Sequence, residues 1–90
     1  MARIHMIAVG GSVMHNLALA LKENGHEVSG SDDQIYEPAL SRLKIAGILP
    51  EELGWHPEKL PANLDYVILG MHAKSGNPEL AEAQALGIPV

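Results

Sequence analysis

The chain has 90 residues, a formal net charge of −5 and no cysteine. The negative charge argues against nucleic acid or an anionic membrane as the main partner, because both bind basic surfaces. The absence of cysteine excludes disulfides and thiolate chemistry and fits a cytoplasmic location. An apolar content of 47% predicts one small domain that folds around an aliphatic core.

Apolar runs broken by glycines predict alternating strands and helices. The expected strands are residues 4–9, 26–31, 66–69 and 88–90, with a weaker strand or turn near 48–49, and the expected helices are 12–24, 38–46 and 78–86. This alternation predicts an α/β fold, a Rossmann-like three-layer α/β/α domain with a mostly parallel sheet of four to five strands. We expect residues 1–90 to form this single domain and to be part of a longer protein, because the sequence stops inside a predicted strand.

The first predicted strand runs through two glycines into a helix. Such a turn presents free backbone N–H groups at the positive end of the helix dipole, where phosphate groups bind. This favours an anion site formed by Gly10, Gly11, Ser12, Val13 and Met14. The alternative is a tight strand-to-helix turn without a ligand.

The dinucleotide fingerprint G-x-G-x-x-G does not fit this turn. In the same frame the chain has Ala8, Gly10 and Val13, and a branched Val13 stands where close helix–strand packing is required. Asp32 does follow about 20 residues later, where a partner for a ribose hydroxyl is expected. Lys74-Ser75 resembles the end of a triphosphate-binding loop, but the glycines required at positions 68 and 73 are absent, which excludes an ATP site there.

Several motifs together resemble the N-terminal domain of the Mur ligases, the ATP-dependent amide ligases of peptidoglycan synthesis. The residues that carry the resemblance are Ile4-His5, Gly10-Gly11, Met14, Leu17-Ala18, the stretch GHEVSGSD from Gly25 to Asp32, and NPEL and GIPV near the end. The resemblance covers essentially the whole chain.

The resemblance implies that the domain binds UDP-N-acetylmuramate. The backbone amides of residues 10–14 would then meet the diphosphate, and Ser31 and Asp32 would flank the nucleoside. Met71, His72 and Ala73 would line the other side of the pocket. ATP and magnesium would bind a central domain, so this segment would hold no cofactor and no catalytic residue, and would bind substrate without turning it over.

Two groups of the family are similar to this chain, the UDP-N-acetylmuramate:L-alanine ligases and the murein peptide ligases, which reattach a recycled tripeptide. Ser12-Val13, the stretch GMHAKSGNP and Trp55 favour the peptide ligases. Gly10 and His15-Asn16 depart from the residues usual in that group.

Two other functions remain as alternatives: a nicotinamide- or flavin-binding domain of an oxidoreductase, and a non-catalytic α/β interaction module. Further interpretations concern single residues. The histidines have no metal-ligand spacing, and His5 is expected to be a hydrogen-bonded core residue. His15 and His72 are candidate site contacts, with a solvent-facing role as the alternative for each. Glu79 is interpreted as part of a solvated helix face that also suits the helix dipole. An unpaired edge strand favours self-association of the chain.

Overall fold

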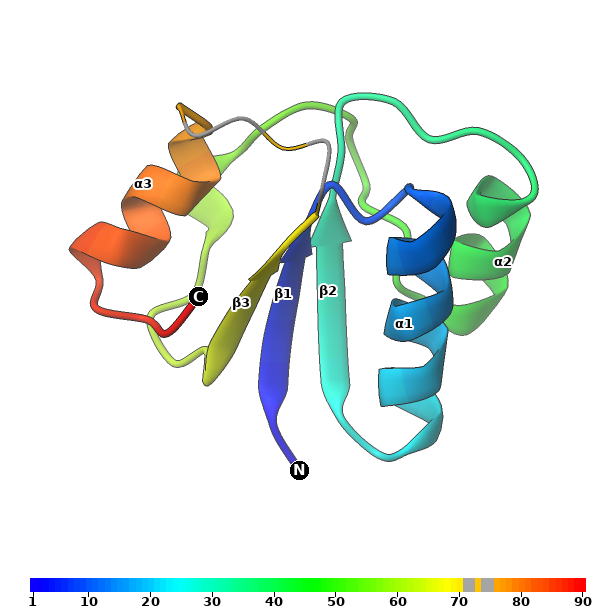
Figure 1. The fold of residues 1–90 in the computed structure, drawn as a ribbon, viewed down its shortest axis with the longest axis horizontal. Helices are drawn as coiled ribbons and strands as arrows, with labels where there is room; N and C mark the ends of the chain where they lie inside the picture. Colours follow the sequence, from blue (N-terminus) through cyan, green and yellow to red (C-terminus); the bar gives the residue numbers. More distant parts are fainter. Residues whose placement is uncertain (71–72, 74–75) are drawn as a thin grey trace.

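The computed structural model describes residues 1–70, 73 and 76–90. In chain order the elements are β1 (Arg3–Ile7), α1 (Ser12–Glu23), β2 (Glu27–Ser31), α2 (Ala39–Ala46), the 3₁₀ helix η1 (Pro57–Lys59), β3 (Tyr66–Leu69) and α3 (Pro78–Ala85) (Figure 1). None of the described helices has the length and apolarity needed to cross a membrane.

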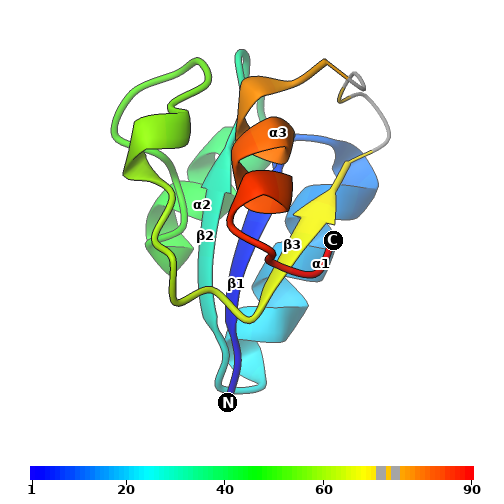
Figure 2. The same cartoon turned by 90° about the vertical axis from the view of Figure 1, so that its left-hand side faces the viewer.

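The sheet is parallel, with strand order β2-β1-β3. In the central strand β1, Ile4 aligns with Val28 of β2 on one side and Tyr66 of β3 on the other. The helices α1 and α2 lie on one face of the sheet and α3 lies on the other (Figures 1 and 2). The α/β class, the parallel sheet and the three-layer arrangement follow the sequence prediction.

The structure has three strands among its described residues, so the predicted count of four to five stays a prediction. Residues 48–49 are not a strand here, and Pro50 directly after them lacks the N–H that a strand ladder needs. Residues 88–90 also lie outside the strands. They do approach β3, because the Val67 N–H donates to the Pro89 carbonyl at 2.8 Å.

The helices α2 and α3 begin or end at residues that the sequence predicted as helix boundaries. Gly47 ends α2 in the left-handed conformation, with φ of 76°. At the start of α3, the Asn77 side chain accepts hydrogen bonds from the backbone N–H groups of Glu79 and Leu80, and Pro78 occupies the first turn. These are the standard solutions for the unpaired groups at helix ends.

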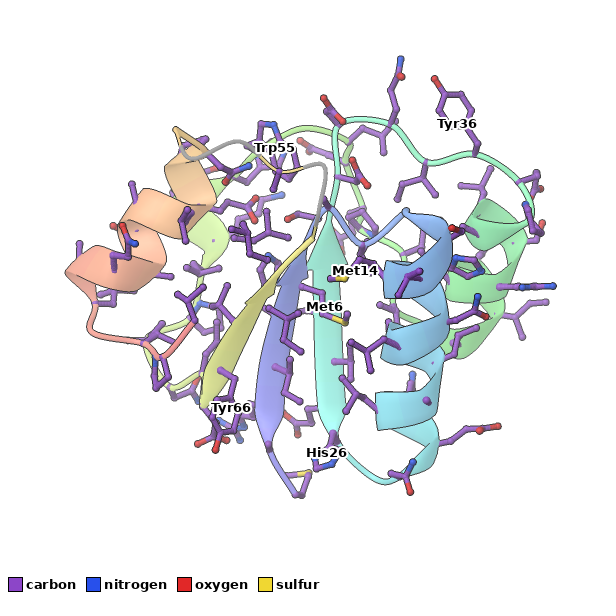
Figure 3. All side chains as sticks on the ribbon, in the orientation of Figure 1. Met6, Met14, His26, Tyr36, Trp55 and Tyr66 are labelled. Carbon is purple, nitrogen blue, oxygen red and sulfur yellow. The ribbon has the colours of Figure 1, made fainter. Side chains whose placement is uncertain are left out.

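Each face of the sheet has its own apolar core. The core beneath α1 and α2 consists of Ile4, Met6, Val9, Ala18, Ile35, Ala39, Leu43 and Ile48. The core beneath α3 consists of Ile7, Leu60, Val67, Leu80, Ala83 and Ile88. Figure 3 shows Met6 and Met14 between the sheet and α1, where Met14 packs against the first core.

Candidate functional site

The carboxyl ends of β1, β2 and β3 meet at one edge of the sheet. From the central β1 the chain continues first to β2 on one side and later to β3 on the other, which makes the gap between β1 and β3 a topological switch point. Open α/β sheets bind ligands at such points. The predicted site residues that the structure describes follow these three strands, so the fold brings their segments to one edge.

The ends of β1 and β3 are in close contact. The Gly70 N–H donates to the Ile7 carbonyl at 2.9 Å. A Cβ atom on Gly70 would lie 2.9 Å from that carbonyl oxygen and 3.0 Å from the Cβ of Ala8. Position 70 therefore accepts only glycine without a backbone shift.

Ala8 begins the turn after β1 in the left-handed conformation, with φ of 64°. This is the position of the first glycine in the dinucleotide fingerprint, and glycine adopts the conformation without the steric cost that a Cβ atom brings. The chain makes the turn with alanine instead. The departure from the fingerprint at Ala8 therefore adds strain without preventing a positive-φ turn.

Gly10 is required by its contact with Asp32. The Gly10 N–H donates to Asp32 Oδ2 at 2.9 Å, and a Cβ atom on Gly10 would lie 2.9 Å from the same oxygen and 3.1 Å from Cγ1 of Ile35. The other carboxylate oxygen accepts from the Asp33 N–H at 2.8 Å. Burial raises the pKa of the Asp32 carboxyl, and the Gly10 N–H offsets part of that rise. Asp32 thus holds the glycine turn in place, and the Gly10 amide is already paired.

The first turn of α1 is open. Gly11 is the N-cap residue in extended conformation, and no side chain among the described residues caps the helix. The Gly11 carbonyl accepts from the backbone N–H of His15 at 2.8 Å and from its Nδ1 at 2.9 Å. Ser12 and Val13 are exposed. The first backbone N–H groups of a helix have no intrahelical acceptor, so this turn offers donors to an anion.

Two interpretations from the sequence are wrong in this region. The Val13 side chain is 71% exposed, so it does not obstruct helix–strand packing. His15 is buried and contacts Arg42 Nη1 through Nε2 at 3.3 Å. His15 therefore lies between α1 and α2, where it supports the turn through the Gly11 carbonyl, and it does not face a ligand.

A buried polar cluster lies beside the turn, on the α3 face. Ser31 at the end of β2 and His5 of β1 both contact Glu79 of α3, His5 through Nε2 to Oε1 at 2.8 Å. The second oxygen of Glu79 accepts from the His56 N–H at 2.8 Å. His5 Nδ1 lies 2.8 Å from Ser29 Oγ. The expectation that His5 is a hydrogen-bonded core residue is confirmed.

Glu79 does not lie on a solvated face as the sequence suggested, because its side chain is 2% exposed. Burial by itself raises the pKa of the carboxyl, but the hydrogen bonds from His5, Ser31 and the His56 N–H outweigh it and hold the pKa below its ordinary value. The partners are distant in the sequence, so helical periodicity could not find them. The one available signal was position, since α3 begins and β2 ends at the same edge of the sheet.

A pocket of about 420 Å³ opens next to this cluster. Residues 29–31, 50–52 and 59–61 form much of its wall, together with His5, His56 and Glu79. Among the described residues of the predicted site, Ser31 is the one that lines it, and the glycine turn lies elsewhere. The open turn and the pocket are therefore separate features joined through Ser31 and Asp32.

The remaining predicted residues differ in how the structure places them. Ala73 is half-buried, packs against the α3 core and donates its N–H to the Gly70 carbonyl at 3.1 Å. Met71 and His72 lie outside the described residues. Trp55 packs against the α3 core. The part of the chain that the structure describes contains no cluster of three or more residues suited to hold a metal ion.

Residues 3–90 match the family described as "Mur ligase family, catalytic domain". The chain is 37% identical over 90 residues to a UDP-N-acetylmuramate–L-alanine ligase of Carboxydothermus hydrogenoformans. It is 36% identical over 89 residues to the UDP-N-acetylmuramate–L-alanyl-gamma-D-glutamyl-meso-2,6-diaminoheptandioate ligase of Escherichia coli. These alignments cover 100% and 97% of the chain but 19% of each relative.

The fold has a solved counterpart among similar enzymes. The structure of the UDP-N-acetylmuramate:L-alanyl-gamma-D-glutamyl-meso-diaminopimelate ligase from Neisseria meningitides superposes with a TM-score of 0.85 at 36% sequence identity. The match covers 99% of this chain and 28% of that one. The chain therefore spans about a fifth of the length of these two relatives and 28% of the solved chain.

Proposed function

The chain belongs to the Mur ligase family, and we propose that it is the part of a peptidoglycan ligase that binds UDP-N-acetylmuramate. The proposal is supported by the open first turn of α1 at the switch point, together with relatives named as UDP-N-acetylmuramate ligases. The family placement expected from the sequence is confirmed, whereas the location of the diphosphate is part of this proposal.

The diphosphate would lie over the first turn of α1. Because the Gly10 amide is paired with Asp32, the donors available to the ligand are the backbone N–H groups at the start of the helix, in the segment Gly11 to Met14. Helix N-termini bind phosphate groups through such donors and through the helix dipole. Ser31 and Asp32 would flank the nucleoside, and residues 71–73 would close the opposite side.

The chemistry of the complete enzyme would need parts outside this domain. In the proposed enzyme ATP and magnesium bind a central domain, and this segment holds the UDP-sugar in the cytoplasm without catalysing amide formation. Ser12-Val13 and Trp55 favour a tripeptide over L-alanine as the incoming group. Phosphate release by the full-length ligase, measured with L-alanine and with the tripeptide in turn, tests that choice.

Substitution of Val13 tests the place of the diphosphate. Val13 is exposed on the first turn, so Val13→Asp and Val13→Asn differ in charge at nearly equal shape and neither disturbs the core. At low salt the aspartate should weaken UDP-N-acetylmuramate binding about tenfold relative to the asparagine, because like charges a few ångströms apart repel by about 1 kcal/mol or more. Isothermal titration calorimetry at two salt concentrations measures this, and the difference should shrink as salt screens the charges.

Two results would contradict the proposal. Equal affinities of the two variants at low salt would place the diphosphate elsewhere. Binding of NAD without a response to UDP or UDP-N-acetylmuramate would instead support the nicotinamide alternative.

A further inference from the structure

Glu79 joins three parts of the molecule that are far apart in the sequence. Its carboxylate accepts hydrogen bonds from Ser31 Oγ in β2, from His5 Nε2 in β1 at 2.8 Å, and from the backbone N–H of His56 at 2.8 Å. A buried carboxylate is unfavourable unless its oxygens are fully hydrogen-bonded. The three donors satisfy it, and the carboxylate in turn fixes their positions relative to one another.

The segment from Gly54 to His56 is held from both sides. The Gly54 N–H donates to the Asp32 carbonyl at 2.9 Å, and two residues later the His56 N–H donates to Glu79. Asp32 itself holds the Gly10 N–H through its side chain. A continuous series of hydrogen bonds therefore connects the start of α3 to the glycine turn after β1.

Each of the three groups around Glu79 acts as a donor. The His56 amide can only donate, and its position is set by the backbone. His5 Nε2 donates because an ionised carboxylate only accepts, and Nδ1 on the other side of the ring is hydrogen-bonded to Ser29 Oγ. A glutamine at position 79 would turn an NH₂ group toward at least one donor. A carboxylate accepts from all three groups as they stand, whereas a glutamine needs the other His5 tautomer together with a reversed Ser31 hydroxyl, or leaves a donor facing a donor.

We infer that Glu79 is the positioning residue for the nucleoside side of the ligand site: through Ser31 and the 54–56 segment it sets the conformation of Asp32. This inference rests on the proposed function, because it assumes that Ser31 and Asp32 flank a bound nucleoside. Glu79 acts through these residues and is not assigned a contact with the ligand. The first turn of α1, where the diphosphate would bind, has a second support that does not pass through Asp32, since the Gly11 carbonyl also accepts from His15 Nδ1.

The test uses Glu79→Gln with Glu82→Gln as the matched control. Glu82 lies in the same helix and, unlike Glu79, is not among its buried residues. Amide hydrogen exchange by NMR is measured on the free chain, and the affinities for UDP and for inorganic pyrophosphate are measured by titration, well below the unfolding temperature. In Glu79→Gln we expect exchange at Gly54 and His56 to accelerate about tenfold or more, UDP affinity to fall about tenfold, and pyrophosphate affinity to change less than twofold.

Other outcomes overturn the inference. An equal loss of UDP and pyrophosphate affinity would mean that Glu79 supports the fold in general. Unchanged exchange at Gly54 and His56 would mean that it does not hold this segment. If the wild-type chain binds neither UDP nor pyrophosphate, the proposed function fails, whereas the exchange rates still support or overturn the role of Glu79 in holding the segment.

Discussion

The two faces of the sheet are held together by different kinds of contact. Beneath α1 and α2 the buried side chains that form the core are aliphatic, from Ile4 to Ile48. Beneath α3 a smaller apolar core lies beside a hydrogen-bonded cluster centred on Glu79, which is 2% exposed. Apolar contacts need area and shape, whereas the cluster needs each donor aligned with its acceptor. Replacing a buried side chain by one of similar size should therefore lower the free energy of unfolding less on the α1/α2 face than on the α3 face.

The largest effect is expected from a cavity in the α1/α2 face. Leu43 is fully buried in that core, so Leu43→Ala should lower the free energy of unfolding by about 2–5 kcal/mol, from lost burial plus the cavity left behind. Leu43→Met, which keeps the volume, should lower it by less than about 1.5 kcal/mol. Urea unfolding followed by circular dichroism measures both. Equal losses for the two variants would show that shape matters as much on this face as on the other.

An intermediate effect with a pH signature is expected from the α3 face. The folded-state pKa of Glu79 lies below its ordinary value of 4.5, so its stabilising contribution is present above that pH and is lost as the pH falls through the folded pKa. Glu79→Gln should lower the free energy of unfolding by about 1–3 kcal/mol at pH 7, because buried donors lose their acceptor.

The difference between wild type and Glu79→Gln should shrink below pH 4.5, as measured by urea unfolding between pH 7 and pH 3. Asp32, with its raised pKa, has the opposite sign: its ionisation disfavours the fold as the pH rises. Glu82→Gln, which leaves the hydrogen bonds around Asp32 in place, provides the reference for that contribution. Glu82→Gln should keep the wild-type pH dependence. A gap between wild type and Glu79→Gln that stays constant down to pH 3 would contradict the ionised cluster.

The smallest effect is expected at Ala8, where the two faces meet at the end of β1. Ala8→Gly removes the Cβ atom from a residue with φ of 64°, which relieves about 1–2 kcal/mol of strain. The greater conformational freedom of glycine in the unfolded chain offsets about 0.4–1 kcal/mol of that stabilisation. The net stabilisation should be about 0–1.6 kcal/mol, measured as a rise in Tm. A lower Tm in Ala8→Gly would show that the packing of its methyl group outweighs the strain.

Local signals predicted much of the fold. The apolar run around Ile4 gave β1, Gly47 ended α2, and Asn77 capped α3, because each signal acts on its own neighbours. The predicted strand near residues 48–49 was a weaker signal, and it ends at a proline that cannot take part in a ladder. Strand pairing depends on a partner from elsewhere in the chain, so a short apolar run does not decide it.

The candidate site divides in the same way. The turn after β1 and the Ser31-Asp32 pair were found from their positions at strand ends. The contact of Asp32 with Gly10 was not, because the same residue pair is compatible with a ligand between them and with a direct hydrogen bond. Glu79 was misread because its helix carries both polar and apolar residues, so the sequence did not show which face is buried. Its burial appears only in the folded structure, where the side chain contacts Ser31 and His5.

The sequence alone predicted the family, which the comparisons confirm, and the order of the three described strands and the α-helices. It also proposed the turn after β1 as an anion site, since such local signals depend on residues close together in the chain. The tertiary structure decided which of those residues are free for a ligand. It paired the Gly10 amide with Asp32, left the first turn of α1 open, and placed Glu79 against β1, β2 and the 54–56 segment. Hydrogen bonds between residues 22 to 74 positions apart form only when the chain folds, so no local pattern records them.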